Sequence, residues 1–481
     1  RDGYVLTNFP YLNNGPKDLI GNSGKGKEYA YRSYFGRVMY SYADRYLFQA
    51  NIRHDGSSRF AKKHRWGTFP SFSAGWVLSE ENFMKNLNWD WLSFLKIRAT
   101  WGALGNERIG DFPYMSTIAF GNTIFYQNNG IYFDQTASQQ KYAIENVTWE
   151  KTESTDIGLD ISFLNNRLRV NGDYYWKNTK DMLLAMAIPD FLGFSDPDVN
   201  AGKMSTKGYE LNVSWNDHIG DFSYGIAINF SDFTSKMGDL QGTQFLGDKV
   251  KMEGSEFNEW YGYVSDGLFL TEEDLKNSPK INDKNTQLGD IKYKDISGPD
   301  GVPDGKISPE YDRVLLGSSL PHFLYGGNIN LGYKNFDLSL AFQGVGKQNA
   351  RLAREMVEPF RNNYGNFPAI IDGNYWSPYN TDEQNAVAKY PRLTHVNKSS
   401  NYAMSDYWLF NGGYFRLKNI TLGYTFPKEW MNAIGIKGAR IYASASDLFC
   451  LSKYPKGWDP EMGVSEYPIT TSILLGVSVN F

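Results

Sequence analysis

The sequence has little of several residue classes, and each shortage excludes a kind of protein. Its 481 residues include a single cysteine, Cys450, so no internal disulfide can form, and five scattered histidines provide no Cys/His metal framework. No apolar run approaches the roughly 20 residues that a membrane helix requires, and the nearest candidate, residues 183–188, is far too short. A net charge of −4 provides no basic surface, so no nucleic-acid partner is expected.

Glycine and aromatic residues are what the sequence has in abundance. It contains 47 Gly, 33 Tyr, 31 Phe and 13 Trp, while hydrophobic residues reach only 41%, and this composition favours strands and turns over helices. The mean hydropathy of −0.49 is, taken alone, that of a soluble protein. The length exceeds what one compact core supports, so several domains, a large barrel or a repeat is expected.

Strict alternation of apolar and polar residues is the dominant pattern along the chain, and it places successive side chains on opposite faces of a strand. In the last segment Ile473, Leu475, Val477, Val479 and Phe481 share one face. The same pattern predicts about thirteen strands, beginning near Tyr31, Tyr46, Phe69, Ser93, Glu150, Arg167, Met204, Phe222, Phe323, Phe336, Tyr414, Ala439 and Ile469.

Connection lengths distinguish a soluble sandwich from a membrane barrel, since both have two-faced strands. Short connections at 43–45, 164–166, 216–220 and 334–335 are rich in turn-forming residues. Long connections, about 103–149, 177–203, 234–322 and 347–413, alternate with them. Alternating short turns and long loops are typical of an outer-membrane barrel, with the turns on the periplasmic side.

The odd number of strands predicts that the chain is part of a larger barrel, because bacterial barrels use an even number. We expect residues 1–30 to be an extracellular loop or the end of a preceding strand, and residues 31–481 to be the C-terminal barrel portion. Aromatic residues near strand ends suit an interfacial girdle. Phe481, which closes the last alternating strand, is a candidate signal for barrel assembly. Lipid should contact the apolar strand faces, including Ile226, Ile228, Leu338 and Leu340.

Sequence blocks spread over almost the whole chain resemble one family. They include Phe35–Tyr42, Arg53–Phe60, Gly67–Trp76, Trp149–Thr152, Asn200–Met204, Gly289–Asp295, Phe415–Tyr424 and Trp458–Glu461, in the family's order. These blocks are similar to those of the SusC/RagA family of TonB-dependent transporters. The resemblance implies an all-β fold: a 22-stranded antiparallel transmembrane barrel of the outer membrane, of which this chain supplies roughly the last 13–14 strands.

The same resemblance implies a function and partners. Family members import oligosaccharides or oligopeptides under a SusD-like surface lipoprotein, powered by the TonB complex, and a dimer of transporter–lipoprotein pairs is a further expectation. The plug domain and the TonB box have no counterpart in this sequence, so contact with TonB is expected through an N-terminal region. A soluble β-rich carbohydrate-binding or glycan-hydrolysing protein is the alternative.

The segment 295–307 resembles an acidic calcium loop, in which carboxylates on a glycine-supported turn surround a hard cation. Asp295, Asp300 and Asp304 are the candidate ligands. Prolines and extra residues interrupt the spacing, and Lys306 stands where an EF-hand has glutamate, so a solvated acidic turn is the alternative. No cofactor is otherwise required.

Aromatic residues in the long loops are the candidate substrate contacts, since aromatic rings stack on sugars and pack against peptides. They are Trp260, Tyr261, Tyr364, Tyr375 and Trp376. The alternative is that these rings hold a loop folded or contact the lipoprotein. Catalytic motifs such as Gly-x-Ser-x-Gly and His-Glu-x-x-His are absent from the sequence, so no enzymatic activity is expected.

Overall fold

A computed structural model describes residues 26–127, 130–139, 142–186, 188–242, 246–282, 284–361, 365–462 and 466–481. Most of the segment 1–30 therefore lies outside the described residues. Within them, no helix is long and apolar enough to cross a membrane.

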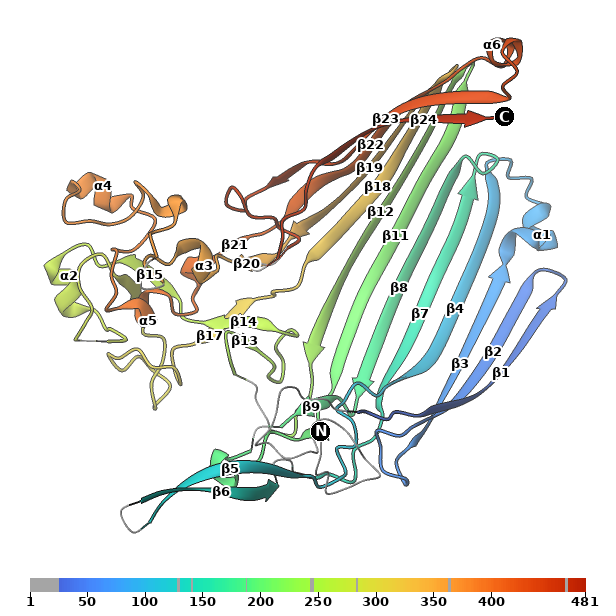
Figure 1. The fold of residues 1–481 in the computed structure, drawn as a ribbon. Coiled ribbons are helices and arrows are strands. Elements are labelled where there is room, and N and C mark those ends of the chain that lie inside the picture. Colours follow the sequence, from blue (N-terminus) through green and yellow to red (C-terminus); the bar gives the residue numbers. More distant parts are fainter. Residues whose placement is uncertain are drawn as a thin grey trace.

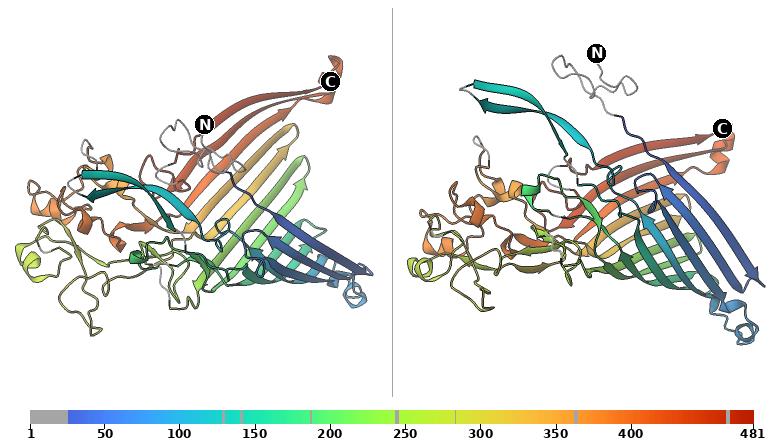
Figure 2. Two further views of the ribbon diagram at one scale, coloured as in Figure 1. Left: turned by 60° about the horizontal axis from the view of Figure 1, so that its bottom comes forward. Right: turned by 90° about the horizontal axis from the view of Figure 1, so that it is seen from below.

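One thirteen-stranded antiparallel sheet dominates the structure and curves into a trough (Figures 1 and 2). Each strand pairs with the next sheet strand along the chain, from β1 to β24. The strands are β1 Tyr31–Tyr42, β2 Tyr46–Ser57, β3 Trp66–Val77, β4 Leu92–Asn106, β7 Glu150–Phe163, β8 Leu168–Lys180, β11 Met204–Ile219, β12 Phe222–Met237, β18 His322–Tyr333, β19 Phe336–Lys347, β22 Tyr414–Thr425, β23 Gly438–Ser452 and β24 Ser472–Asn480.

The thirteen predicted strands are confirmed, and so is the all-β antiparallel fold. The largest differences in starting residue occur at β3, which begins at Trp66 rather than Phe69, and at β24, which begins at Ser472 rather than Ile469. β3 begins earlier than predicted because Trp66, Gly67 and Thr68 still pair with β2, with Trp66 opposite Gly56.

The strand register gives the sheet an apolar face and a polar face. Ile226, Ile329, Leu340 and Ile420 lie directly opposite one another on four consecutive strands, and Leu331, Leu338 and Leu422 form the next row. Asn171, Asn212 and Asn229 form a row on the opposite face. Because a one-residue slip would move every side chain to the other face, these rows fix the register. The predicted apolar face is therefore confirmed.

Turns and loops lie at opposite ends of the sheet (Figure 1). At the turn end, the connections contain residues with positive φ, among them Ala43, Asp44, Gly220 and Lys334, as tight strand connections require. The two longer turns carry the helices α1 Asn82–Lys85 and α6 Lys428–Ala433.

At the loop end, two long connections fold together into a compact body, here called the loop unit and defined as 238–321 and 348–413 (Figure 1, left). Its strands are β13 Lys249–Val250, β14 Glu259–Gly262, β15 Ser265–Leu268, β16 Ile291–Tyr293, β17 Val314–Gly317, β20 Asn349–Arg351 and β21 Leu409–Asn411. Its helices are α2 Glu272–Asn277, α3 Arg354–Val357, α4 Asp382–Ala386 and α5 Lys398–Asn401.

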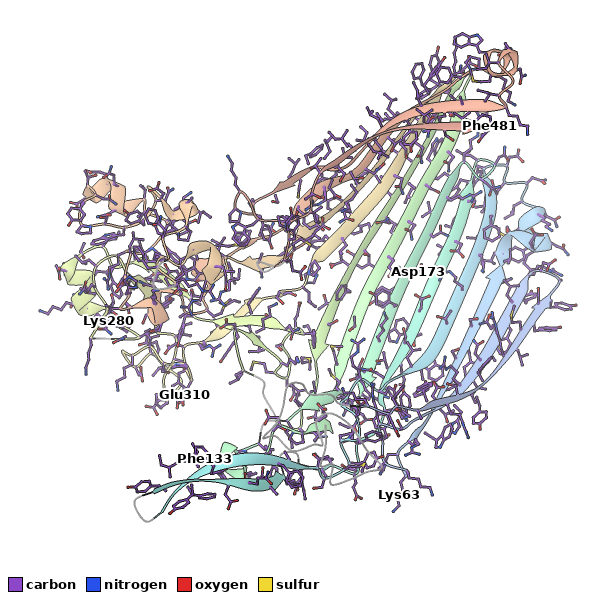
Figure 3. All side chains as sticks on the ribbon, viewed as in Figure 1. Lys63, Phe133, Asp173, Lys280, Glu310 and Phe481 are labelled. Atoms are coloured by element: carbon purple, nitrogen blue, oxygen red, sulfur yellow. The ribbon has the colours of Figure 1, made fainter. Side chains whose placement is uncertain are left out.

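Two further pieces of strand belong to the remaining loops. The hairpin of β5 Ile118–Gln127 and β6 Gly130–Gln139 extends away from the sheet, and Phe133 lies along it opposite Ile124 (Figure 3). The short strands β9 Leu183–Ala185 and β10 Asp198–Asn200 pair with each other in the connection between β8 and β11.

The largest buried apolar cluster lies in the loop unit rather than in the sheet. It joins residues from both long connections, including Tyr263, Tyr293, Val357, Trp376 and Trp408. Two smaller clusters lie where loops meet strand ends, one around Trp149 and one around Met237. The sheet, by contrast, leaves most of its large apolar side chains exposed.

Candidate functional site

The polar face of the sheet carries an ion network that crosses three strands. Arg98 on β4 reaches over β7 to Asp173 on β8, with 2.6 Å between Nη2 and Oδ2. The same guanidinium lies 3.3 Å from both Asp156 Oδ1 and Asp160 Oδ2. Gly158 makes this span feasible, because a Cβ at that position would be only 2.4 Å from Arg98 Cζ. The middle strand therefore needs a residue without a side chain.

A second bridge of the same design lies near the turn end. Arg440 on β23 passes over Gly423 on β22 to Asp337 on β19, with Nε 3.1 Å from Oδ1. A Cβ at Gly423 would be 2.3 Å from Arg440 Nη2. Arginine, glycine and aspartate on successive strands thus recur as a way to connect three strands on the polar face.

The polar face is hollowed across β2, β3 and β4, where small hydroxyl side chains replace large ones. The hollow has a volume of about 670 Å³, and its lining includes Asn51, Arg53, Ser71, Ser73 and Thr100. Asn51 Nδ2 donates to Ser71 Oγ over 3.1 Å. Such a surface presents hydroxyl and amide donors and acceptors to a polar molecule, beside the ion pair of Arg53 and Asp55.

A nearly buried arginine attaches the connection between β23 and β24 to the polar face. Arg416 is 2% exposed, and its Nη2 lies 2.6 Å from Asp459 Oδ2, while its Nε pairs with Glu461. Gln343 Nε2 donates to the second oxygen of Glu461 over 2.9 Å. The segment Trp458–Glu461, noticed in the sequence as a family block, is thereby held against the sheet.

In the loop unit a fully buried carboxylate joins the two long connections. Asp290 accepts hydrogen bonds from Arg392 Nε at 2.7 Å, Asn397 Nδ2 at 2.8 Å and Asn401 Nδ2 at 2.9 Å. The backbone N–H of Gln287 donates to the same group over 2.9 Å. Both carboxylate oxygens are therefore satisfied, as a buried charge requires. The sequence places Asp290 in a family block but gave no sign of this role.

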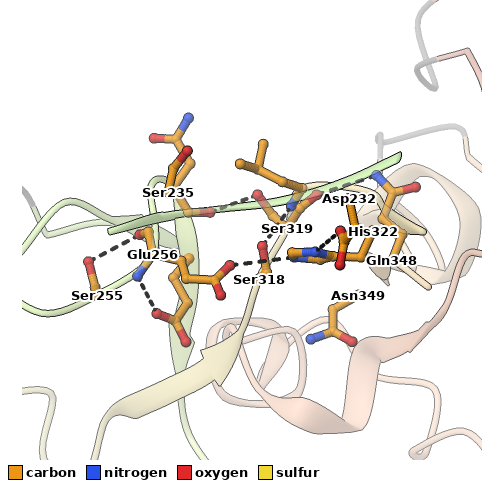
Figure 4. Close-up of polar contacts among 12 residues, drawn as sticks. Asp232, Ser235, Ser255, Glu256, Ser318, Ser319, His322, Gln348 and Asn349 are labelled. Carbon is orange, nitrogen blue, oxygen red and sulfur yellow. Dashed lines mark hydrogen bonds and ion pairs between the residues drawn. The ribbon is translucent and has the colours of Figure 1, made fainter. Parts of the chain in front are cut away.

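His322 anchors the loop unit where it enters the sheet (Figure 4). Its Nδ1 lies 2.8 Å from Asp232 Oδ1 on β12, and its Nε2 lies 3.6 Å from Glu256 Oε2 in the loop unit. Beside it, Gln348 Nε2 donates to the carbonyl of Ser319 over 3.3 Å. The imidazole stands between two carboxylates on different elements, which fixes the start of β18.

Of the candidate aromatic contacts, Trp260 and Tyr261 on β14 are half-buried and engaged within the loop unit. The Trp260 indole N–H donates to the carbonyl of Asn349, and Lys249 Nζ lies 4.5 Å from the centre of its ring. Burial lowers the pKa of the Lys249 ammonium. Arg313 Cζ lies 4.5 Å from the centre of the Tyr261 ring. Both side chains thus have partners in the loop unit itself.

Tyr375 and Trp376 lie together on a cleft of about 580 Å³, whose lining also includes Glu272, Tyr379 and Arg392. Trp376 is only 9% exposed and packs closely against Gly289, whereas Tyr379, which the sequence reading missed, is 95% exposed. The fifth candidate, Tyr364, lies outside the described residues. The structure therefore brings two of the five candidates to one cleft, and their role in binding stays a prediction.

The acidic segment forms a turn that its own backbone supports. Asp295 Oδ2 accepts from Gly305 N over 2.6 Å, and Asp304 Oδ1 accepts from Lys306 N over 3.0 Å, while Asp300 is exposed. Buried Asp312, which sequence reasoning missed, accepts from the N–H groups of Ile296, Ser297 and Ser308. Across the described parts of the chain, no three His, Cys, Asp or Glu side chains are placed to hold a metal. Calcium binding at this turn stays a prediction.

Two other surfaces bear on function. Phe481 directly follows β24 and is 83% exposed, and its role as an assembly signal stays a prediction. The β5–β6 hairpin exposes large apolar side chains, among them Ile118, Ile124, Ile131 and Phe133 at 62–75%. The sequence offered a signal for it, since Asn-Asn-Gly at 128–130 separates two runs rich in β-branched and aromatic residues.

Comparison with known proteins identifies the fold. The family described as "TonB dependent receptor-like, beta-barrel" matches residues 2–448. SusC of Bacteroides thetaiotaomicron, a TonB-dependent receptor, is 32% identical over 468 residues, which cover 93% of this chain and 43% of SusC. TonB-dependent receptor P3 of Formosa agariphila is 31% identical over 453 residues, which cover 89% and 42%.

Solved structures agree with this assignment at the level of the fold. The RagAB peptide transporter structure superposes with a TM-score of 0.77 at 23% identity, covering 98% of this chain and 50% of that one. The chain thus spans about half the length of the proteins it matches. The relatives named here are described as TonB-dependent receptors and a peptide transporter, and in a membrane β-barrel of the matched kind the apolar strand face meets lipid while the polar face lines the lumen. The chain belongs to the TonB-dependent receptor-like β-barrel family, within its SusC/RagA type.

Proposed function

We propose that this chain forms the C-terminal wall of a TonB-dependent importer that carries oligosaccharides or oligopeptides across the outer membrane. The observation that carries the proposal is the two-faced sheet: a continuous apolar face suited to lipid, and a polar face with bridged charges and a hydroxyl-lined hollow. The residues of this chain would shape and line the path, and none would perform covalent chemistry.

Capture would take place at the loop end. There the cleft beside Tyr375, Trp376 and Tyr379 combines aromatic rings with the polar groups of Glu272 and Arg392. Rings that stack and groups that donate and accept hydrogen bonds suit either a glycan or a peptide. Trp260, Tyr261 and Tyr364 are further candidate contacts. The similarity to SusC and to the RagAB peptide transporter supports this substrate range without choosing within it.

A SusD-like lipoprotein would cover the loop end, and the β5–β6 hairpin is the surface we assign to it. A two-stranded hairpin is marginal in water, and this one exposes Ile118, Ile124, Ile131 and Phe133. An apolar surface of this kind marks an interaction site. The TonB complex would act through a part of the protein outside this chain, and pairs of transporter and lipoprotein could further associate as dimers.

Calcium at the acidic turn is a further proposal. Asp295 Oδ1 is buried without a hydrogen-bond partner, so one ligand oxygen is available beside Asp300 and Asp304. Occupancy would bring oxygens to about 2.4 Å from the ion.

The test of the import proposal uses the full transporter in cells that lack their own copy. A Ser71→Trp, Ser73→Trp variant would fill the lumen hollow, and Ala99→Trp on the lipid face serves as the matched control. We expect at least a tenfold loss of uptake of labelled oligosaccharide or oligopeptide mixtures in the first variant and little change in the second. Normal uptake by the Ser71→Trp, Ser73→Trp variant, with both variants present in the outer membrane at equal amounts, would contradict the proposed path.

A further inference from the structure

A groove lies on the lipid face of the sheet near its turn end, centred on β23. It has a volume of about 440 Å³ and spans β19, β22, β23 and β24. The side chains that line it on the lipid face are apolar or aromatic: Phe336, Leu422, Tyr424, Ile441, Ala443, Leu475 and Val477. It is therefore a depression in the surface that faces the hydrocarbon.

The groove follows from the side-chain sizes that the register brings side by side. Ala443 lies directly between Leu422 and Leu475, and one row further along Ala445 lies between Ile420 and Ile473. Two successive outward-facing alanines on β23 thus lie between larger side chains on the neighbouring strands β22 and β24. The result is a furrow parallel to the strand, and Leu422 and Leu475 stand out from it with 51% and 80% exposure.

One end of the furrow has aromatic walls and points toward the turn between β22 and β23, which carries basic residues. The rings of Phe336 and Tyr424 approach to 4.8 Å between centroids. Beyond them is the turn that carries α6, with exposed Lys428 on the helix and exposed Lys437 directly before β23. Glu429 is the acidic residue between them, so this turn has a net charge of plus one. Aromatic rings and lysines at a strand end suit the boundary between acyl chains and headgroups.

We propose that this furrow is a binding site for one glycerophospholipid, with an acyl chain along Ala443 and Ala445 and the phosphate near Lys428 and Lys437. The furrow is continuous with the lipid-facing surface, and its direction along the strand matches an extended chain. The turn end of such a barrel faces the periplasm, so the lipid comes from the inner leaflet. A second copy of the chain is a poorer occupant, because stable interfaces use about 20–30 residues per partner and ten residues line this groove.

Within a bilayer, packing rather than transfer from water drives apolar groups together, so a side chain that fills the furrow should remove the contacts that hold the acyl chain. The experiment purifies the full transporter from cells, delipidates it in detergent, titrates phosphatidylethanolamine and phosphatidylglycerol, and counts bound lipids by native mass spectrometry. Ala443→Phe fills the furrow. Ala99→Phe, an exposed outward alanine on β4, is the matched control, and heat-modifiable migration on gels confirms that both variants are folded.

In the titration we expect the wild type and Ala99→Phe to bind one phospholipid and Ala443→Phe to bind it at least tenfold more weakly. A Lys428→Ala, Lys437→Ala variant should weaken phosphatidylglycerol binding by a smaller factor. Equal retention by wild type and Ala443→Phe would overturn the proposal. Retention of lipopolysaccharide in place of phospholipid, or a dimer that dissociates only in Ala443→Phe, would also overturn it. The readout does not involve uptake, so its failure is distinct from failure of the import proposal.

Discussion

The sheet and the loop unit place their large apolar side chains in opposite directions. On the lipid face of the sheet, large apolar side chains point outward, and Leu475 is 80% exposed in the isolated chain. In the loop unit they point inward, and Trp408 is 2% exposed. Arg98 and its carboxylates lie on the opposite, lumen face of the sheet, whereas the loop unit buries Asp290 among its apolar side chains and satisfies it with hydrogen bonds. One chain thus contains a part built for hydrocarbon outside and a part built for water outside.

The largest expected effect follows from the buried carboxylate of the loop unit. Asp290→Ala leaves the partly buried Arg392 guanidinium without its partner, and breaking a buried ion pair costs about 3–5 kcal/mol. We expect the loop unit to become sensitive to protease while the barrel keeps its heat-modifiable migration on gels. Asp372→Ala, at an exposed position of the loop unit, is the control and should change neither. Simultaneous loss of both properties in Asp290→Ala would show that the two parts do not unfold separately.

A charge on the lipid face should have the next largest effect. Ile228 lies mid-strand on β12 with its side chain outward, and lysine near the bilayer midplane costs about 2–4 kcal/mol. We therefore expect Ile228→Lys to lower the free energy of unfolding in lipid by that amount, measured by urea titration of the reconstituted full transporter. Asn229→Lys places the same charge on the lumen face of the neighbouring position, where the cost should be much smaller. Equal costs would contradict the assignment of the two faces.

The smallest effect concerns acid stability of the loop unit. Burial alone would raise the pKa of the Glu358 carboxyl, but hydrogen bonds and charge from Arg354 and Lys398 outweigh it and hold the pKa below its ordinary value. A lowered pKa stabilises the folded state above the ordinary value of about 4.3, and that contribution is lost as the pH falls through the lower folded pKa.

Protease sensitivity of the loop unit, followed as the pH is lowered, measures this effect. Wild type should lose protection in acid, and Glu358→Gln should show a flatter dependence with lower protection at neutral pH. Glu272→Gln, on the exposed face of α2, should follow the wild-type curve. A wild-type protection that does not depend on pH in this range would argue against the lowered pKa.

The sheet could be predicted from sequence because its physics is local. Alternation along each strand and the lengths of the connections determine strand number, faces and ends, and the register follows from keeping one face apolar. The loop unit could not be predicted in this way. Its core joins Tyr263 to Trp408, and Asp290 meets Arg392 across about a hundred residues, with no periodic signal to connect them.

The candidate sites show the same division. Trp376 is a candidate substrate contact because tryptophan in a long loop is suited to stacking. Most of its surface is nevertheless covered, since the loop folds around it. Exposed Tyr379 lies three residues away, and nothing in the sequence distinguishes it from its neighbours. The β5–β6 hairpin carries a turn signal in the sequence, yet the prediction places it within a long connection. Its strands pair only with each other and do not join the large sheet.

The glycines beneath the arginine bridges impose a constraint on how this wall can change through evolution. Gly158 and Gly423 each provide space for a contact between residues of the two flanking strands, so neither can acquire a side chain while its bridge persists. A substitution at such a glycine becomes tolerable only after the arginine or the aspartate has changed. Related chains should therefore vary at these three-residue sets as units, and a relative with a bulky residue at the glycine position should lack at least one charged partner.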